Sequence, residues 1–371
     1  MAHWEVWLCD PTGYRLECLR RTAGFAVSRV QNAIGATTIV LPEYYDDLVK
    51  LDYILEYWRK PNGGTLKFYR SYFMRHWRYD EDTHTTQVWG YDGNYITDGR
   101  TVAYDAASAQ SLQTDYLDDM CKVIAIDAFG ADAGAGRDLS SVGGGVSVAA
   151  ELGAAPSATK GFSWRGVSDV FADLAAASRA AGTNLYYDMV ESFTSAGKIA
   201  WTFRTYTGTR GADHTSDSDN PLHFGAAWGN LSGGYYEVDH TDERNYIYGR
   251  GQGERSTRYE GDASDTARIG ASIWNRREEY CNAAAGGEGA SDASTLADAK
   301  ARLEQGRPKW RAGGALLDTP RARYGVDFDW GDRVSVDIRR KQVDAEITAD
   351  AFSVDGSGNE SAEFRFEVEG A

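Results

Sequence analysis

The sequence predicts an α+β protein that is mostly β. Apolar and polar residues alternate, as in strands with one buried face, through the first hundred residues and again from about Gly233. Helical periodicity is limited to the middle of the chain and to one segment near residue 300. Aromatic residues form 12% of the 371 residues, and such side chains favour strands and half-buried interfaces. The expected order is therefore β, then α+β, then β.

The first region, 1–103, is predicted to form six or seven strands joined by short turns. Its opening stretch "HWEVWLC" has apolar residues at every second position. The "DPTG" that follows has Pro and Gly at the second and fourth positions of a turn. Only 43–50 is expected to form a short helix. This pattern predicts a small β-barrel or sandwich.

The second region, 104–232, begins where the composition changes near Thr101. A helix is expected within 103–130, because several apolar residues share one helical face. These residues are Leu112, Tyr116, Leu117, Met120, Val123 and Ile124. The Gly- and Ser-rich loop 131–147 is expected to be flexible in an isolated subunit, since its residues bury too little apolar surface to offset ordering entropy.

A second helix is predicted at 163–182, with Ser163 as its N-cap and Gly182 just past its C-terminal end. Two strands, 183–192 and 198–208, are expected to follow it.

The third region, 233–371, is predicted to be mostly β with one amphipathic helix at 294–307, for which Ser294 is the expected N-cap. The last two strands are expected to form a hairpin through "DGSGN". The expected strands lie within 234–242, 244–253, 255–262, 324–338, 343–354 and 360–370.

The stretch "YIYGRGQGERSTRY", 246–259, places Gly249, Gly251 and Gly253 at every second position. A dinucleotide loop needs G-x-G-x-x-G before a helix, and a P-loop needs G-K-[ST], so neither phosphate motif fits. We expect extended or bulged backbone whose bare face lets another segment approach closely. No helix is expected to start within two residues of Gly253.

No catalytic constellation emerges from the sequence. There is no G-x-S-x-G nucleophile elbow and no pair of histidines at H-x-x-x-H spacing. The adjacent carboxylates Glu278–Glu279 and Asp242–Glu243 would point to opposite faces of a strand. We therefore assign no catalytic, cofactor-binding or metal-binding residue, and we expect no enzyme, no cofactor and no stoichiometric metal. Whether the acidic loop 210–221 binds Ca²⁺ stays open, because it lacks the Gly and distal Glu of a calcium loop.

The net charge of −16 argues against a nucleic-acid groove built on bulk positive charge. The four cysteines form no C-x-x-C pair, and reduced, mostly buried thiols are favoured over a disulfide between Cys9 and Cys18. No signal peptide and no apolar run of about 18–20 residues is present. A soluble protein without a membrane anchor is expected.

Several motifs in order resemble the tail-hub, or baseplate-hub, proteins of long-tailed siphophages. A D-x-x-G turn joins two hydrophobic strands, and an aliphatic strand then ends in Pro. Further motifs follow along about two-thirds of the chain, leaving the middle region without support. The motifs are "VWLCDPTGYRLECL", "VQNAIGATTIVLP", "LDYILEYWR", "TQVWGYDGNYITDGRTV", "YIYGRGQGERSTR", "SIWNRREEYCNA" and "WGDRV".

The resemblance implies two β-barrel-like domains, 1–103 and 233–371, flanking the α+β middle region 104–232. It implies a homotrimer whose six barrels form a ring that closes the tail tube of the virion, after assembly in the host bacterial cytoplasm. The implied partners are the distal tail or tail-tube ring proteins, the tape-measure protein and tail-tip or fibre proteins. Genomic DNA would only pass through the channel, and an acidic lumen is expected.

Two alternatives stay open. Exposed Tyr and Trp could stack on cell-wall sugars, which would make the chain a non-catalytic carbohydrate- or receptor-binding tail protein. A tail-associated cell-wall hydrolase is the third reading, and the lack of a catalytic constellation argues against it.

Overall fold

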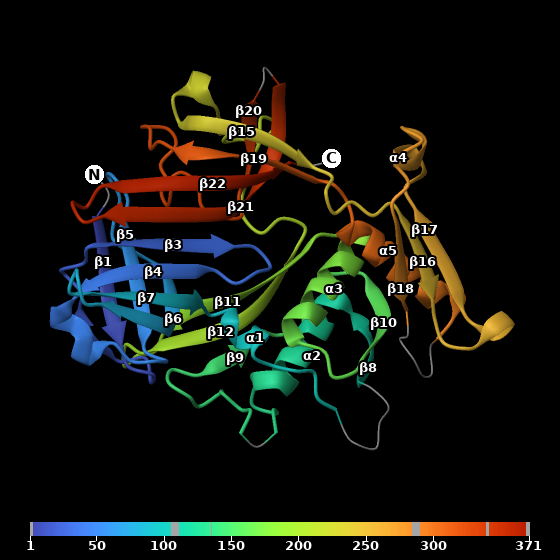
Figure 1. Ribbon diagram of the computed structural model, residues 1–371, viewed down its shortest axis with the longest axis horizontal. Helices are drawn as coiled ribbons and strands as arrows, with labels where there is room; N and C mark the ends of the chain where they lie inside the picture. Colours follow the sequence, from blue (N-terminus) through green and yellow to red (C-terminus); the bar gives the residue numbers. More distant parts are fainter. Residues whose placement is uncertain (1–2, 105–110, 135, 284–289, 339–340, 369–371) are drawn as a thin grey trace.

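The computed structural model describes residues 3–104, 111–134, 136–283, 290–338 and 341–368. Strands account for 46% of the chain and helices for 17%, so the predicted mostly β class is confirmed (Figure 1). None of the helices in these ranges is long and apolar enough to cross a membrane.

The N-terminal region forms seven strands, as predicted, and a short 3₁₀ helix, η1 (Glu43–Leu48), where a short helix was expected. In the first turn, the Gly13 amide donates to the Asp10 carbonyl over 2.9 Å. The strands are β1 (His3–Cys9), β2 (Arg15–Cys18), β3 (Gly24–Val30), β4 (Ala36–Pro42), β5 (Ile54–Lys60), β6 (Lys67–Asp80) and β7 (Thr85–Asp92).

The C-terminal strands join the N-terminal ones in a single sheet, in the order β15-β19-β22-β21-β3-β4-β7-β6-β5-β1-β2, with every neighbouring pair antiparallel. The strand β20 pairs with β21 and carries two short parallel strands, β13 and β14. The bounds are β13 (Asp213–His214), β14 (His223–Phe224), β15 (Leu231–Asp239), β19 (Lys309–Leu316), β20 (Arg333–Ile338), β21 (Lys341–Asp355) and β22 (Glu360–Val368). The predicted hairpin between the last two strands is confirmed.

The two ends of the chain meet where β3 pairs with β21, from Val30 opposite Ala349 to Gly24 opposite Asp355. One hydrophobic core lies between them, and Ile39 and Phe352 are both buried in it. The two separate barrel-like domains expected at the ends are not confirmed. Because the 15-residue β21 is long enough to pair with both β20 and β3, the strands of both regions form one sheet and no closed barrel. The domain boundaries 1–103, 104–232 and 233–371 stay a prediction.

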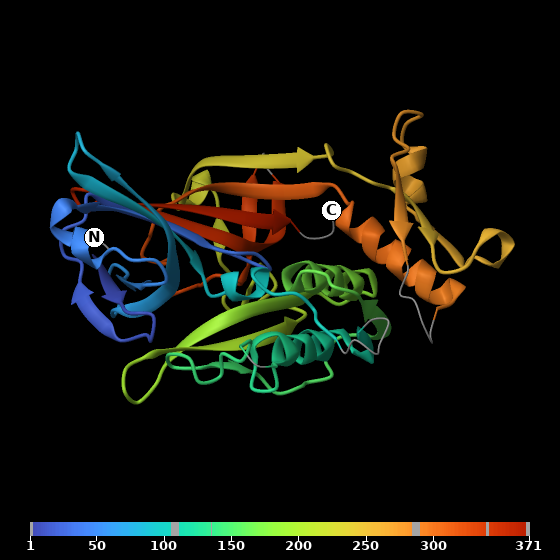
Figure 2. The same cartoon turned by 60° about the horizontal axis from the view of Figure 1, so that its bottom comes forward.

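The middle region has its own core, in which Phe129, Phe171 and Phe203 are fully buried. The helices α2 and α3 pack against β12 and β11, respectively (Figure 2). The short helix α1 (Tyr95–Asp98) connects this region to the sheet. Its other elements are β8 (Ser111–Tyr116), α2 (Leu117–Phe129), β9 (Val146–Val148), β10 (Ser157–Phe162), α3 (Val167–Ala180), β11 (Leu185–Phe193) and β12 (Ile199–Thr207).

The helix expected within 103–130 is shorter than predicted. Its 111–116 part is the strand β8, which pairs with β10 from a distant part of the chain. The helix starts at Leu117, where Asp118 and Asp119 fill its first turn and accept backbone hydrogen bonds from the loop before β10. Residues 105–110 lie outside the described ranges.

The N-cap predicted at Ser163 is wrong, since α3 begins at Val167 after Gly166. The Ser163 hydroxyl instead lies 2.9 Å from the Tyr104 hydroxyl, and Trp164 adopts a φ of 52° that a helix cannot continue. The other end of the helix is as predicted, because Gly182 follows the C-cap with a φ of 91°.

The loop 131–147, apart from residue 135, is tied to its surroundings by backbone hydrogen bonds. The Leu139 amide donates to the Phe129 carbonyl, and the Gly144 amide to the Ile199 carbonyl. Its flexibility in an isolated subunit stays a prediction.

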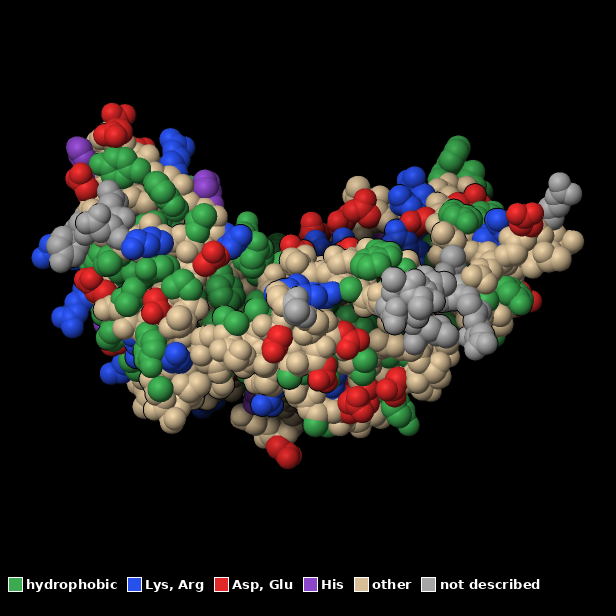
Figure 3. Space-filling model, turned by 90° about the horizontal axis from the view of Figure 1, so that it is seen from below, with side chains coloured by type: hydrophobic (Ala, Val, Ile, Leu, Met, Phe, Trp, Pro, Cys, Tyr) green, Lys and Arg blue, Asp and Glu red, His purple; other side chains and the backbone are tan. Residues whose placement is uncertain are grey.

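A small unit projects from the sheet at the far end from the N-terminus, and we call β16, β17, β18, α4 and α5 the projecting unit (Figure 1). A space-filling view shows the hollowed outline between this unit and the opposite end (Figure 3). The bounds are β16 (Tyr246–Arg250), β17 (Glu260–Ser264), α4 (Thr266–Gly270), β18 (Glu278–Asn282) and α5 (Asp292–Gln305). The helix α5 covers its three-stranded sheet, over a core to which three of the described residues contribute buried side chains: Ile247, Ala263 and Ala299.

The N-cap of α5 is Ser291 rather than the predicted Ser294. Ser294 is the third helical residue and completes a capping box. The hydroxyl of each of these two serines accepts a hydrogen bond from the backbone amide of the other.

The glycine-rich stretch has the packing role predicted for it at Gly249. Gly249 lies opposite Gly261, and a Cβ at Gly249 would stand 2.2 Å from the Gly261 carbonyl oxygen and 3.0 Å from the Ala299 Cβ of α5. The bare glycine faces therefore let α5 approach the sheet closely.

The expectation that no helix starts within two residues of Gly253 is wrong. A single 3₁₀ turn, η3 (Arg255–Thr257), begins there. Gly253 adopts a φ of 104°, and the Tyr259 amide donates to the Gln252 carbonyl. The loop is thereby closed within a few residues, which leaves room for one helical turn and not for a helix with an anion-binding end.

Candidate functional site

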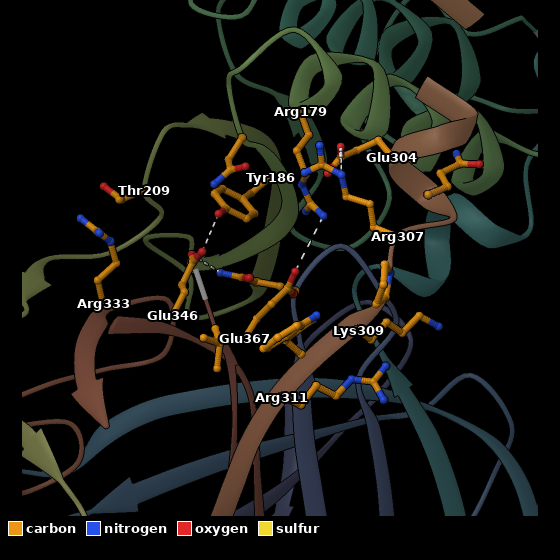
Figure 4. A pocket seen from close by; sticks show the side chains of 16 residues that line it. Arg179, Tyr186, Thr209, Glu304, Arg307, Lys309, Arg311, Arg333, Glu346 and Glu367 are labelled. Atoms are coloured by element: carbon orange, nitrogen blue, oxygen red, sulfur yellow. Dashed lines mark hydrogen bonds and ion pairs between the residues drawn. The ribbon is translucent and has the colours of Figure 1, made fainter. Parts of the chain in front are cut away.

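A groove of about 650 Å³ opens where the middle region, the projecting unit and the main sheet meet (Figure 4). Its walls come from α3 and β11, from the end of α5 and the start of β19, and from β20, β21 and β22. No segment of sequence could have indicated it, because its lining residues run from Gln31 to Val368. The groove is the candidate functional site.

Among the residues that the structure describes, five basic side chains line this groove against three acidic ones. The groove is therefore locally basic on a chain whose net charge is −16. The basic residues are Arg179, Arg307, Lys309, Arg311 and Arg333, and the acidic ones are Glu304, Glu346 and Glu367.

The arginines on the groove walls form ion pairs that face solvent. Arg307 Nε lies 2.9 Å from Glu304 Oε2, and Arg179 Nη1 lies 3.8 Å from Glu367 Oε1. Pairs of this kind contribute little to stability and can exchange partners. Within the described ranges, Lys309 forms no ion pair, so its ammonium group is available to a ligand.

The floor of the groove is a fixed polar contact. Glu346 accepts a hydrogen bond from the Tyr186 hydroxyl at 2.5 Å and another from the Gln31 amide at 2.7 Å. Burial, together with the neighbouring Glu346 carboxylate, raises the pKa of Tyr186, so the phenol stays a donor. Burial also raises the pKa of Glu304.

These side chains can hold an anion. No Ser, Cys or His side chain lines the described walls of the groove. Guanidinium and ammonium groups around a polar floor suit a carboxylate-bearing segment of another protein.

A second charged cluster is buried where the main sheet meets the middle region. We call Arg70, Asp92, Asp188, Glu191 and Arg210 the buried charge cluster. Arg70 Nη2 lies 2.7 Å from both Asp92 and Asp188, and Arg210 Nη2 lies 2.7 Å from Asp188. Arg70 also contacts Glu191 at 3.2 Å. Strands β6, β7 and β11 are thereby joined by paired charges.

The buried charge cluster holds three carboxylates and two guanidinium groups, one negative charge in excess. Burial raises the pKa of Asp92 to about 7, and Arg70 offsets only part of that effect. Burial also raises the pKa of Glu191. Burial alone would raise the pKa of Asp188 as well, but its two arginine partners lower it. The cluster therefore binds a proton at Asp92 more readily than an exposed aspartate would.

Sequence reasoning did not identify this cluster. One signal was available in "LYYDMV", where Asp188 stands in the middle of an otherwise apolar and aromatic strand.

Two of the carboxylates considered in the sequence form ion pairs with arginines. Asp213 pairs with Arg333 at 2.9 Å, and Glu278 pairs with Arg276. Among the described residues, no group of three or more His, Cys, Asp or Glu could hold a metal ion. The strand register places Cys9 opposite Arg15 and Cys18 opposite Trp7, so these two thiols do not face each other.

A family model described as Siphovirus ReqiPepy6 Gp37-like protein matches residues 69–361. The match runs from β6 to the start of β22, across the middle region and the projecting unit. It confirms the predicted resemblance to siphophage tail proteins.

Three solved structures of tail proteins share the fold. The tail protein from Neisseria meningitidis MC58 aligns with a TM-score of 0.56 and 12% identity, covering 99% of this chain and 97% of its own. The prophage MuSo2 43 kDa tail protein from Shewanella oneidensis aligns with a TM-score of 0.53 and 12% identity, covering 98% of each chain. The prophage tail protein gp18 from Listeria monocytogenes EGD-e aligns with a TM-score of 0.51 and 11% identity, covering 98% of this chain and 94% of its own. Among curated proteins, none matches this chain significantly.

Proposed function

The chain belongs to the Siphovirus ReqiPepy6 Gp37-like protein family, and we propose that it is a structural protein of a siphophage tail that serves as the hub of the tail tip. One observation carries this proposal: the family match covers residues 69–361, from β6 and β7 through the middle region and the projecting unit to β21 and the start of β22. The fold shared with three tail proteins along nearly their whole length supports it.

In this role three copies form a ring that closes the tail tube, and each copy contributes the sheet that its two terminal regions share. The ring contacts the distal tail or tail-tube proteins, the tape-measure protein and the tip or fibre proteins. The charged groove suits an acidic segment of one such neighbour. The chain is then a component of the virion tail that is assembled in the host cytoplasm, without catalytic activity, cofactor or metal.

DNA passage gives this role an electrostatic requirement. A basic lumen would bind phosphates with a steep salt dependence and would retard ejection. The chain carries 55 acidic against 39 basic residues, so we expect carboxylates to outnumber Lys and Arg along the lumen. Counting the charged side chains that line the channel of an assembled particle tests this, and a surplus of Lys and Arg would contradict it.

The mass of the purified chain under native conditions tests the hub. A trimer is expected, and averaged electron micrographs of it should show a ring with a central channel. A chain that stays monomeric at all concentrations would contradict the hub.

One observation favours a second candidate, a non-catalytic protein that binds cell-wall sugars. Several aromatic side chains are exposed, among them Trp164 and Trp274, and such rings stack on sugars. A monomer that sediments with isolated host cell walls would support this candidate. A zymogram with the same walls tests the hydrolase, which we expect to show no clearing.

A further inference from the structure

The tip of the projecting unit exposes two large apolar side chains side by side. Ile273 is 88% exposed and Trp274 is 83% exposed. They follow α4, which Figure 1 shows at the top of the projecting unit. In the isolated chain most of the apolar surface of these two side chains therefore stays exposed to water, and a partner could bury it.

These residues occupy the two central positions of a tight turn. The Asn275 amide donates to the Ser272 carbonyl over 3.0 Å, so Ile273 and Trp274 form the corner. Turn corners ordinarily hold Gly, Pro, Asn, Asp or Ser. A β-branched residue and a tryptophan at these positions have no local structural reason.

The turn is held in place from below. The Asn245 side-chain amide donates to the Asn275 carbonyl at 2.5 Å, and the Asn275 side chain donates in turn to the Arg268 carbonyl. The Arg277 amide donates to the Asn245 side chain at 2.9 Å. A tryptophan on a backbone fixed in this way is a typical anchor of a protein interface, because little ordering entropy remains to be lost on binding.

The segment 266–277 is basic. It contains Arg268, Arg276 and Arg277 and no acidic residue. Arg268 is paired with Glu243 and Arg276 with Glu278, whereas Arg277 forms no ion pair with any described residue. The segment therefore suits a partner whose apolar recess carries carboxylates. A lipid surface fits less well, because two apolar side chains with three arginines fall short of the two strong signals that stable anchoring needs.

Such a recess lies on another surface of this same chain. A hollow of about 390 Å³, large enough for an indole, opens beside Leu316 and Leu317 at the end of β19. Asp318 and Glu360 lie in its wall with one guanidinium, that of Arg59, between them. Leu317 is 50% exposed. Burial raises the pKa of Asp318 despite Arg59, so a further cation would stabilise its carboxylate.

We propose that the Ile273–Trp274 turn of one copy docks into the recess beside Leu317 of a second copy, with Arg277 against Asp318 and Glu360. The turn and the recess are different surfaces of the chain, so the contact is head-to-tail. A head-to-tail contact generates a ring when its rotation closes. The inference rests on the proposed multi-copy hub and identifies the contact that joins its copies.

Sedimentation velocity of wild type and two single variants tests the contact. Trp274→Ser removes the anchor, and Leu317→Lys places in the recess a positive charge that repels the arginine of the incoming turn. Both positions are exposed, so both variants should fold. Each should weaken self-association by roughly 30-fold or more, the loss expected for a hot-spot tryptophan. The matched control is Leu152→Ser, an apolar side chain that is 67% exposed in the middle region, which should assemble like wild type.

Mixing the two variants gives the sharper result. Each variant keeps one intact half of the contact, so a one-to-one mixture should form a dimer and nothing larger. Wild-type assembly that Trp274→Ser leaves unchanged would overturn this inference and leave the hub intact. A wild type that is monomeric throughout would overturn both. Binding of wild type to anionic phosphatidylserine vesicles that is lost with Trp274→Ser, without self-association, would assign the turn to a lipid surface instead.

Discussion

The buried charge cluster and the charged groove both set arginines against carboxylates where the main sheet meets the middle region, yet their environments differ. The Arg70 side chain is 4% exposed and lies 2.7 Å from two carboxylates. The Arg179 side chain is 39% exposed and lies 3.8 Å from one. Desolvated charges must stay paired, whereas solvated ones can change partners. The comparison indicates that the buried charge cluster holds the main sheet and the middle region together, whereas the side chains of the groove are free to bind a carboxylate-bearing segment.

Replacing Arg70 with Met should have the largest effect. It leaves three buried carboxylates facing only Arg210, and breaking such a buried pair costs about 3–5 kcal/mol. The free energy of unfolding from urea titration measures this loss. A loss below about 1 kcal/mol would show that the cluster is no stronger than the groove.

Replacing Asp188 with Asn should cost less, about 1–3 kcal/mol, the range for leaving buried donors unsatisfied. The amide keeps the shape of the side chain and one acceptor oxygen, but Arg70 and Arg210 lose their shared charge. The same urea titration measures it. A cost equal to that of the Arg70 variant would indicate that the two residues act only as one unit.

The cluster should also respond to pH through Asp92. Because its pKa is about 7 in the folded chain and about 4 when unfolded, the folded state binds the extra proton, and the stability from this group is lost as pH rises through 7. Asp92→Asn removes this titration. As pH rises from 6 to 7, the free energy of unfolding of the variant should therefore increase by about 1 kcal/mol relative to that of wild type. Parallel stability curves for the two proteins would contradict the prediction.

In the groove, replacing Arg179 with Met should change stability by less than about 1 kcal/mol, since exposed pairs contribute little. Added salt should remove even this difference. A loss comparable to that of Arg70→Met would mean that the groove holds the fold together and is not free to bind.

The features that the sequence predicted correctly are those that depend on neighbouring residues. The seven N-terminal strands were expected from alternation and turn residues, and Gly182 was expected from the helix end it marks. Cap positions were less certain because serines recur nearby: Ser294 was chosen where Ser291 is the N-cap, and Ser163 where none caps the helix.

What depends on distant partners could not be predicted. The pattern of 103–130 fits a helix throughout, and only pairing with β10 shows that its 111–116 part is a strand. The joining of both ends in one sheet depends in the same way on β3 and β21. The groove gathers residues from all three regions and the buried charge cluster from the first two, so neither has a motif.

The pairing of β3 with β21 also means that one strand of the pair is synthesised long before the other. Arg29 and Asp350, partners across this joint, are 321 residues apart in the chain. At about 5–20 residues per second, a ribosome needs roughly 15–60 s between them. During that time the first strands wait with the edge of β3 open, and an open edge invites pairing with another chain. A cell that makes many copies at once therefore depends on the last strands arriving before a neighbour does.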